Sequence, residues 1–335
     1  MAISINRRAA LIGSVAAAGA VSGGTISAGS AFAQAKPKLK FSSAFTDQDI
    51  RAEAYKALGA AMKDDFDFEP YFGSTLFKQG TEVVAMQRGN LEMCNLSPND
   101  VSKQIPAWSL LTSAYLFRDS DHLKKTFKSD IGQEMMKQVR DQLGIQMIAP
   151  VFFGTRQVNL RPTKKISTPA DLAGMKMRMP PGEFWQFLGE AMGTNPTPVA
   201  FAEVYTALQT GTIDGQDNPL VLSRTMKFHE VTKQFVLTGH VVGYDMCSVS
   251  AKVWDAFKPE QRTKFAAAAE QAFDACAAKY NSLEKDAIDF FKAQGLEVYA
   301  PDTNAFRTHM QKKYLESAMA KDWPKGMLER INAIK

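Results

Sequence analysis

The residue best suited to bind a charged ligand in this sequence is Arg178. The stretch 175–179 alternates methionine with Lys176 and Arg178, which predicts a short strand with its methionines toward a core and its basic residues on the other face. Pro180 and Pro181 end this strand and lead into a predicted helix at 183–192. Arg178 then lies near a strand's carboxyl end, where open α/β sheets bind ligands, and its planar fork of donors matches a carboxylate or phosphate. The alternative is an arginine paired on the surface.

Acidic residues near this stretch offer a second kind of chemistry. Glu203, Asp214 and Asp217 are close enough in sequence to suggest a carboxylate pair for acid/base catalysis. Helix caps and salt bridges are the commoner explanation for acids at helix starts and strand turns. The sequence has no nucleophile elbow, phosphate-binding loop, zinc-protease motif or CxxC pair. This favours a binding protein over an enzyme, with no metal or other cofactor expected.

The elements that must position these residues follow a strand–helix alternation, which predicts an α/β fold with a parallel sheet and helices on its faces. The pattern predicts the following order: a strand at 39–42, a helix at 47–63, a strand at 66–69, a helix at 73–86, a strand at 91–96, one long helix at 123–143, a buried strand at 145–153, and one or two long helices at 259–293.

An internal echo suggests that this architecture is duplicated. Residues 85–92 resemble residues 207–214, and each segment reads as a helix end, a glycine cap and the start of a strand. Polar residues follow both copies, namely Asn95, Ser97 and Asn99 after the first and Gln216, Asp217 and Asn218 after the second. Chance recurrence of glycine caps is the alternative for so short a match.

The first 35 residues are expected to be a cleaved export signal. Arg7 and Arg8 precede a weakly apolar run, and Ala31-Phe32-Ala33 is a small-residue cleavage site. The paired arginines also resemble a twin-arginine leader, so either export route remains open. The run is too diluted by Gly, Ser and Thr for a membrane span. The mature protein, residues 36–335, is expected in the periplasm.

Composition limits the partners of the mature chain. Its 300 residues are enough for two lobes. The formal net charge of +5 becomes +3 without Arg7 and Arg8, which argues against nucleic acid or an anionic membrane as partner. Cys94, Cys247 and Cys276 lack metal-ligand spacing and are expected to be buried.

Three stretches resemble the solute-binding subunits of tripartite ATP-independent periplasmic (TRAP) transporters of the DctP type. They are Tyr115–Asp119 (YLFRD), Thr168–Pro180 (TPADLAGMKMRMP) and Phe201–Leu220 (FAEVYTALQTGTIDGQDNPL). The resemblance covers most of the mature chain in order. It implies a two-lobed periplasmic binding protein fold with hinge strands and a long helix bracing both lobes. Residues 36–155 with 244–283 would form lobe I, and residues 156–243 with 284–335 would form lobe II.

The resemblance also implies roles for particular residues. Arg178 matches the family arginine that pairs with the ligand carboxylate, and Arg156 matches a second arginine near the hinge. Asn218 matches the pocket asparagine, and Phe201 matches an aromatic residue near the carboxylate. The partners would be a small organic acid and the membrane permease subunits of the transporter, with the binding protein a monomer.

The ligand itself is the open question. Trp185 could stack on a sugar ring or an aromatic acid, or it could belong to the core. Lobe I offers Asp47, Ser74 and Asn95 at predicted strand ends, a mixture suited to hydroxyl groups, and Asp47 would repel a second carboxylate. We therefore expect a monocarboxylate, with a uronate or similar sugar acid first and an aromatic or other hydroxy acid second. An exported enzyme that converts such an acid is the alternative of another class.

Overall fold

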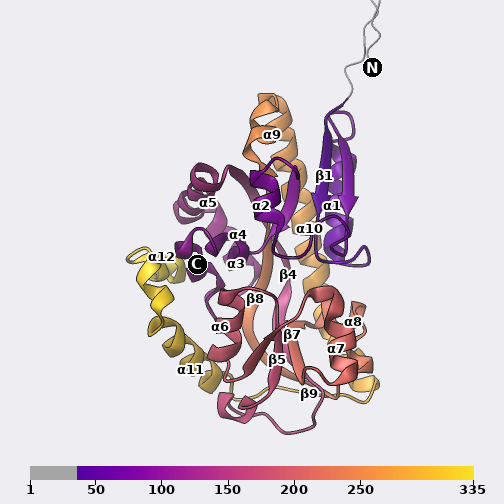
Figure 1. The fold of residues 1–335 in the computed structure, drawn as a ribbon, viewed down its shortest axis with the longest axis vertical. Helices are drawn as coiled ribbons and strands as arrows, with labels where there is room; N and C mark the ends of the chain where they lie inside the picture. The colour runs from indigo at the N-terminus through magenta and orange to yellow at the C-terminus, as the bar shows by residue number, and fades with distance from the viewer. Residues whose placement is uncertain (1–35) are drawn as a thin grey trace, which may run out of the picture. The chain divides into compact units, whose positions relative to one another are not determined.

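The computed structural model describes residues 36–335, and the predicted export signal lies outside the described residues. Residues 36–335 form one compact unit built on a nine-stranded mixed sheet, shown in Figure 1. The strand order is β2-β1-β3-β8-β4-β7-β5-β6, and β9 pairs with β8.

The strands are β1 (Lys38–Ser42), β2 (Asp67–Tyr71), β3 (Met93–Leu96), β4 (Ile145–Leu160), β5 (Lys176–Met179), β6 (Asn195–Pro198), β7 (Gly215–Pro219), β8 (Gln234–Ser250) and β9 (Glu297–Tyr299). The α-helices are α1 (Ile50–Ala61), α2 (Glu82–Gln87), α3 (Pro98–Ser102), α4 (Ser120–Lys128), α5 (Asp130–Leu143), α6 (Glu183–Ala191), α7 (Val204–Thr210), α8 (Leu220–Thr225), α9 (Ala251–Ala256), α10 (Pro259–Ala293), α11 (Thr303–Leu315) and α12 (Met327–Ala333).

The sheet reads the same from either edge, which confirms that the architecture is duplicated. In one half, β1 pairs in parallel with β2 and β3, and β3 pairs antiparallel with β8. In the other, β5 pairs in parallel with β6 and β7, and β7 pairs antiparallel with β4. The echo at 85–92 and 207–214 marks the helix-to-strand turns before β3 and β7, where Gly89 and Gly211 both have positive φ. Glycine takes that conformation without steric cost.

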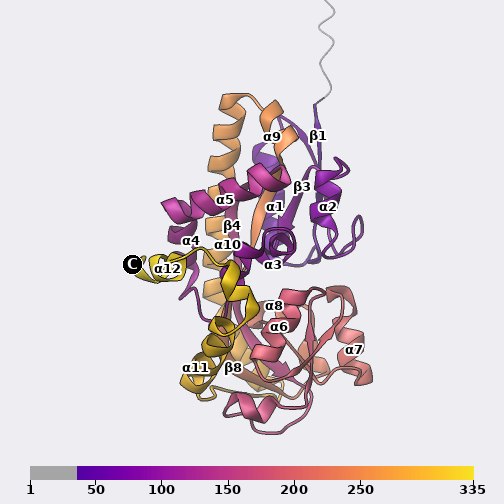
Figure 2. The same ribbon diagram turned by 60° about the vertical axis from the view of Figure 1, so that its left-hand side comes forward.

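Two long antiparallel strands, β4 and β8, run through both halves. We call the half containing β1–β3 lobe I and the half containing β5–β7 lobe II. The 35-residue helix α10 packs against α1 of lobe I and α8 of lobe II, and Figures 1 and 2 show it spanning both. It forms the single long helix allowed by the sequence, because no glycine or proline interrupts it after its first turn.

The C-terminal segment differs from its expected place in lobe II. Helix α11 packs on β8 and α6, but α12 packs on α5 of lobe I (Figure 2). Met327 and Ile331 on α12 join the lobe I core, and Arg330 pairs with Asp130 at 3.0 Å. The chain therefore returns to lobe I after α11, where α12 buries Met327 and Ile331 against the core.

Two predicted helices also differ from the structure. The helix expected at 73–86 begins only at Glu82, since Gly73, Ser74 and Gly80 have positive φ values of 69°, 59° and 87°. Such backbone conformations cannot belong to a right-handed helix. The helix expected at 123–143 is divided at Ser129, whose extended backbone ends α4 and precedes α5. An apolar pattern with a four-residue repeat cannot reveal a break that leaves both helices facing the same core.

The cysteines occupy the positions that the sequence predicts. Cys94, Cys247 and Cys276 are all free and buried, two of them in β3 and β8 and one in α10. Across residues 36–335, no helix has the length and apolar character needed to cross a membrane.

Candidate functional site

A cavity lies where the carboxyl ends of strands from the two lobes meet. Its walls come from the ends of β1, β3, β5 and β7, from the loop before α2, and from the two long strands. The lining residues are Ala44, Phe45, Arg51, Gln79, Gly80, Glu82, Asn95, Ser97, Asp100, Phe153, Arg156, Arg178, Pro180, Pro181, Trp185, Phe201, Asn218, Leu222 and Asp245.

Arg178 reaches the cavity from the end of β5, as its position in the sequence predicts. Its neighbours Met177 and Met179 are fully buried in the lobe II core, and Arg178 itself is only 1% exposed. The Nε atom donates to the Val199 carbonyl at 2.8 Å, and Nη2 has no partner within residues 36–335. Burial, followed by the Arg156 charge, lowers the pKa of Arg178 to about 9. The geometry thus offers a buried cation with unfilled donors.

Arg156, on β4, differs from Arg178 because it is already paired. Its Nε and Nη2 atoms donate to the two carboxylate oxygens of Asp217 at 2.7 and 2.9 Å. The Nε2 atom of buried His240 lies 3.0 Å from the same carboxylate. Burial alone would raise the pKa of Asp217, but Arg156 and His240 outweigh it and hold that pKa well below its usual range. Arg156 is therefore fixed in orientation at the cavity wall.

Aromatic and amide side chains complete the lobe II wall. The Arg156 guanidinium carbon lies 4.9 Å from the centre of the Trp185 ring, and that of Arg178 lies 5.7 Å from the Phe201 ring. Trp185 is therefore a wall residue, whereas Phe187 on the same helix packs edge-on against Tyr314 in the core. Asn218 is oriented by the Gln216 side chain, to which its Nδ2 atom donates.

Lobe I contributes Arg51, which, like Arg156, is paired with carboxylates of the protein. Arg51 donates to both oxygens of Asp49 and, at 2.7 Å, to Oδ2 of Asp245. Its guanidinium lies between the rings of Phe45 and Phe153, at 4.3 and 4.1 Å. Burial would lower its pKa, but the two carboxylates raise it above its ordinary value. Arg51 is thus fully paired and stacked.

The Asp245 carboxylate is fixed by two lobe I donors. Its Oδ2 atom accepts from Arg51 and, at 2.9 Å, from Nδ2 of Asn95. The Oδ1 atom of Asn95 is buried without a partner in the described part of the chain. Burial raises the pKa of Asp245, while Arg51 and Asn95 oppose that shift. Lobe I therefore presents oxygen acceptors to the cavity.

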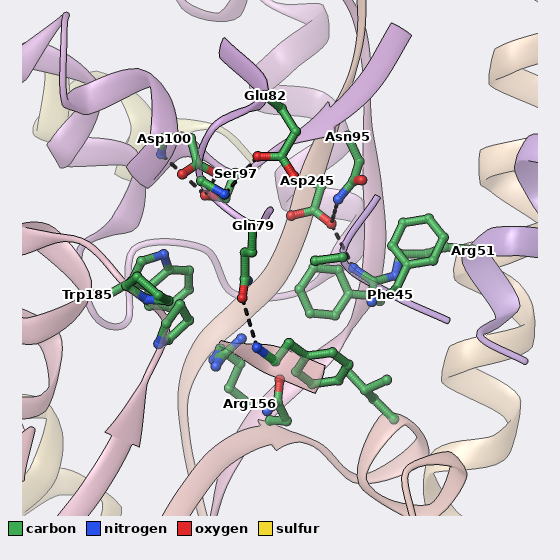
Figure 3. A pocket seen from close by; sticks show the side chains of 18 of the residues that line it. Phe45, Arg51, Gln79, Glu82, Asn95, Ser97, Asp100, Arg156, Trp185 and Asp245 are labelled. Atoms are coloured by element: carbon green, nitrogen blue, oxygen red, sulfur yellow. Dashed lines mark hydrogen bonds and ion pairs between the residues drawn. The ribbon is translucent and has the colours of Figure 1, made fainter. Parts of the chain in front are cut away.

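Glu82, at the start of α2, is the least compensated acid of the cavity. It is 5% exposed and accepts from the Gly80 backbone N–H at 2.7 Å. No lysine, arginine or histidine among residues 36–335 forms an ion pair with it, whereas neighbouring Asp100 pairs with Lys103 at 3.0 Å. Burial, with Asp100 adding to it, raises the pKa of Glu82 to about 7. Figure 3 shows Glu82 and Asp245 on one side of the cavity and Arg156 and Trp185 on the other.

Within the described part of the chain, a hydrogen bond joins the two lobes at the cavity itself. Gln79 in the loop before α2 accepts at Oε1 from the Phe201 backbone N–H at 3.0 Å, drawn as a dashed line in Figure 3. The bond therefore links the loop before α2 in lobe I to the short turn Phe201–Glu203, which precedes α7 in lobe II.

The structure brings most of the predicted site residues together, but not all of them. Arg178, Arg156, Asn218, Phe201, Trp185 and Asn95 all line the cavity. Asp47 and Ser74 do not line it. Asp47 is exposed and pairs with Lys56 along α1, and Ser74 is held in a left-handed turn after β2.

Sequence reasoning missed the lobe I residues Arg51, Gln79, Glu82, Asp100 and Asp245 as lining residues. Only the strand order β1-β3-β8 brings them together, and Arg51 and Asp245 are 194 residues apart in the chain. Glu82 had one local signal, an acid at the first position of a helix and directly before the apolar pair Val83-Val84, but the same signal marks many helix starts.

Two of the three acids considered for catalysis have structural partners, and the third is exposed at the surface. Asp214 accepts at Oδ2 from the Lys176 backbone N–H at 2.8 Å, and Asp217 is the partner of Arg156. Glu203 is exposed on the turn before α7.

A cavity between two α/β lobes, crossed by two long strands and carrying an unpaired buried cation, defines the class of two-lobed solute-binding proteins. The chain matches the model of the DctP family, described as bacterial extracellular solute-binding protein, family 7, over residues 45–321, and it belongs to this family. This confirms the resemblance to TRAP solute-binding subunits, which are transport proteins of the periplasm rather than enzymes.

Relatives and solved structures agree with the family assignment. The chain is 32% identical over 229 residues to the sialic acid-binding periplasmic protein SiaP of Vibrio cholerae, covering 68% of this chain and 70% of that protein. A TRAP solute-binding protein of Roseobacter denitrificans, solved with bound 3-deoxy-D-manno-oct-2-ulosonic acid (KDO), has a TM-score of 0.88 and 40% identity, covering 90% of this chain and all of that one. Another from Polaromonas sp. JS666, bound to D-erythronate, has a TM-score of 0.82 and 26% identity, with 90% and 99% covered.

Proposed function

We propose that this protein captures a small sugar acid with a single carboxylate in the periplasm and delivers it, as a monomer, to a TRAP membrane permease. The observation that carries the proposal is the state of Arg178, a fully buried guanidinium with a free Nη2 atom and no acidic partner in the described chain. Leaving a buried charge unpaired is costly, so a carboxylate from the ligand is the natural partner. Arg156 at the same wall is already paired with Asp217, so Arg178 is the cation that the ligand carboxylate would neutralise.

The lobe I wall supports a ligand rich in hydroxyl groups. Asp245 and Asn95 present oxygen acceptors there, and hydroxyl groups can donate to them. The nearby acids Glu82, Asp100 and Asp245 would repel a second carboxylate. The sequence predicts this repulsion of a second carboxylate from Asp47, but Asp47 lies outside the cavity.

Among sugar acids, a ulosonic acid such as KDO is the first compound to test, because the relative that binds KDO is 40% identical over nearly the whole mature chain. A uronate, the first expectation from the sequence, is the second. An aromatic acid is less well supported, because the Arg156 guanidinium already lies against Trp185.

A thermal-shift screen of the mature protein, residues 36–335, tests this function. The panel contains KDO, D-galacturonate, D-galactonate, D-erythronate, succinate and benzoate, and titration calorimetry follows each hit. A ligand that binds only the folded state raises stability by RT ln(1 + [L]/Kd), which is about 2.7 kcal/mol at a hundredfold excess over Kd. Stabilisation by at least one sugar acid, recovered unaltered by mass spectrometry, is the expected result. No stabilisation by any sugar acid, or recovery of a converted product, would refute the proposal.

A further inference from the structure

The charged residues of the cavity fall into two groups once their partners are compared. Four of them are compensated within the protein: Arg51 by Asp49 and Asp245, Asp245 by Arg51, Arg156 by Asp217, and Asp100 by Lys103. Within residues 36–335, Arg178 and Glu82 are the two that form no ion pair. They lie on opposite lobes, and no ion pair joins them to each other. The protein therefore holds one uncompensated cation and one uncompensated acid facing the same space.

Burial makes this arrangement informative about the ligand. Arg178 is 1% and Glu82 is 5% exposed, so neither charge is solvated by bulk water when the lobes are in contact. A buried charge without a partner destabilises the folded protein, whereas a surface acid needs no partner because water solvates it. Backbone N–H groups of residues 80–82 act on the Glu82 carboxylate, with Gly80 donating to Oε2 at 2.7 Å, and they fix its place without supplying an ion-pair partner. A ligand group that donates a hydrogen bond would supply the Glu82 carboxylate with a further hydrogen-bond partner.

We infer that Glu82 is the specificity-determining residue of lobe I, accepting a hydrogen bond from a hydroxyl at the end of the sugar acid remote from the carboxylate that Arg178 binds. The inference rests on the proposed function, and it adds a rule of selectivity. A terminal hydroxyl is accepted, and a terminal carboxylate is rejected, because it would face Glu82, the one acid of this wall that has no ion-pair partner among residues 36–335. The raised pKa of Glu82 agrees with this rule, since its environment already disfavours negative charge.

A pair of six-carbon acids isolates the selected group. D-Galactonate and galactarate differ only in the last carbon, which is a hydroxymethyl group in the first and a carboxylate in the second. The affinities of both, and of KDO, are measured by calorimetry for the wild type, Glu82→Gln and Glu82→Leu. Glu53→Gln is the matched control, because Glu53 is an exposed lobe I glutamate that pairs with Lys279 away from the cavity.

The expected results separate hydrogen bonding from charge. Glu82→Leu, which removes the acceptor, should weaken KDO binding by about tenfold or more, and Glu82→Gln, which keeps a carbonyl acceptor, should weaken it less. The preference for galactonate over galactarate should fall by about tenfold in Glu82→Gln, because the repelling charge is gone. Glu53→Gln should match the wild type in every measurement. Melting curves check that each variant is folded.

Two outcomes count against these ideas and can be told apart. If the wild type binds no sugar acid of the panel, the proposed function fails, and the inference fails with it. If the wild type binds KDO and both Glu82 variants bind it within about twofold of the wild type, Glu82 is not a ligand contact and the inference alone is overturned.

Discussion

Replacing Arg178 with methionine should separate its cost to the empty protein from its value to the complex. Methionine has a similar length, fills irregular core space and carries no charge. At about 1.4 kcal/mol for each tenfold step, the difference between the ordinary pKa of 12.5 and the value of about 9 amounts to about 5 kcal/mol of unfavourable burial. Loss of the hydrogen bond from Nε to Val199 removes about 1 kcal/mol of stabilisation.

The net effect is up to about 4 kcal/mol in favour of the variant when no ligand is present. This is the largest possible gain, because opening of the lobes hydrates the arginine of the wild type. At about 2 °C of Tm for each kcal/mol in a chain of this size, the ligand-free Arg178→Met protein should melt several degrees higher than the wild type.

The ligand should reverse this order. The wild type gains stability with KDO, or whichever sugar acid the screen finds, whereas Arg178→Met should gain almost none. Arg178→Lys is the matched variant, since it keeps a charge but loses the planar fork, and its affinity should fall by about ten- to a hundredfold. Scanning calorimetry with and without ligand measures all three proteins. A ligand-free Arg178→Met protein that melts below the wild type and still shows the full ligand shift would refute the reasoning.

Three further predictions follow from single contacts. Gln79→Ala removes the hydrogen bond that the Phe201 N–H donates across the lobes. It should increase the rate of ligand release about fivefold with little change in the association rate, as stopped-flow fluorescence can measure. Gln87→Ala, a control outside the cavity, should leave the release rate unchanged. The pKa of Glu82 rises from 4.5 to about 7 on folding, so its stabilising contribution is full below pH 4.5 and is lost as the pH rises through 7. The stability of Glu82→Gln relative to the wild type should therefore increase by up to about 3 kcal/mol between pH 5 and pH 8, as urea denaturation measures. A stability difference that does not change with pH would contradict this. Asp47→Asn breaks an exposed ion pair with Lys56, so it should change stability by less than about 1 kcal/mol and leave affinity unchanged, and a large loss of affinity would place Asp47 at the ligand after all.

The parts of the site that the sequence predicts are those with a local cause. The alternation around Arg178 sets its strand and face within five residues, and Pro180 and Pro181 fix where the strand ends. The aromatic residue Trp185 follows within one helical turn, so its approach to the cavity is also set locally. Arg156 and Asn218 were placed by resemblance to the family, and β4 and β7 bring them to the same wall.

The lobe I wall has no such local cause. Asp245 enters the cavity because β8 pairs with β3, which places it beside Asn95 across 150 residues of chain. The sequence gives the strands but not their order, so it cannot say which polar residues meet. Asp47 shows the opposite error. It lies in the loop between β1 and α1, where Asp49 caps α1 and Asp47 pairs with Lys56 at the surface.

The duplicated sheet explains why the ligand site is divided between donors and acceptors. Strands β3 and β7 occupy equivalent places in the two halves, and each ends beside one of the long strands that run through both lobes. Asn95 near the end of β3 and Asn218 near the end of β7 therefore line the same cavity from the two lobes. In lobe II, Asp217 on β7 is paired with Arg156, so Arg178 has no acidic partner among residues 36–335. In lobe I, Asn95 on β3 donates a hydrogen bond to Asp245. The unpaired cation for a ligand carboxylate lies in lobe II, and the oxygen acceptors for ligand hydroxyl groups lie in lobe I. A sugar acid that meets both needs contacts across the lobes, so the groups that select it are also the groups that favour lobe closure.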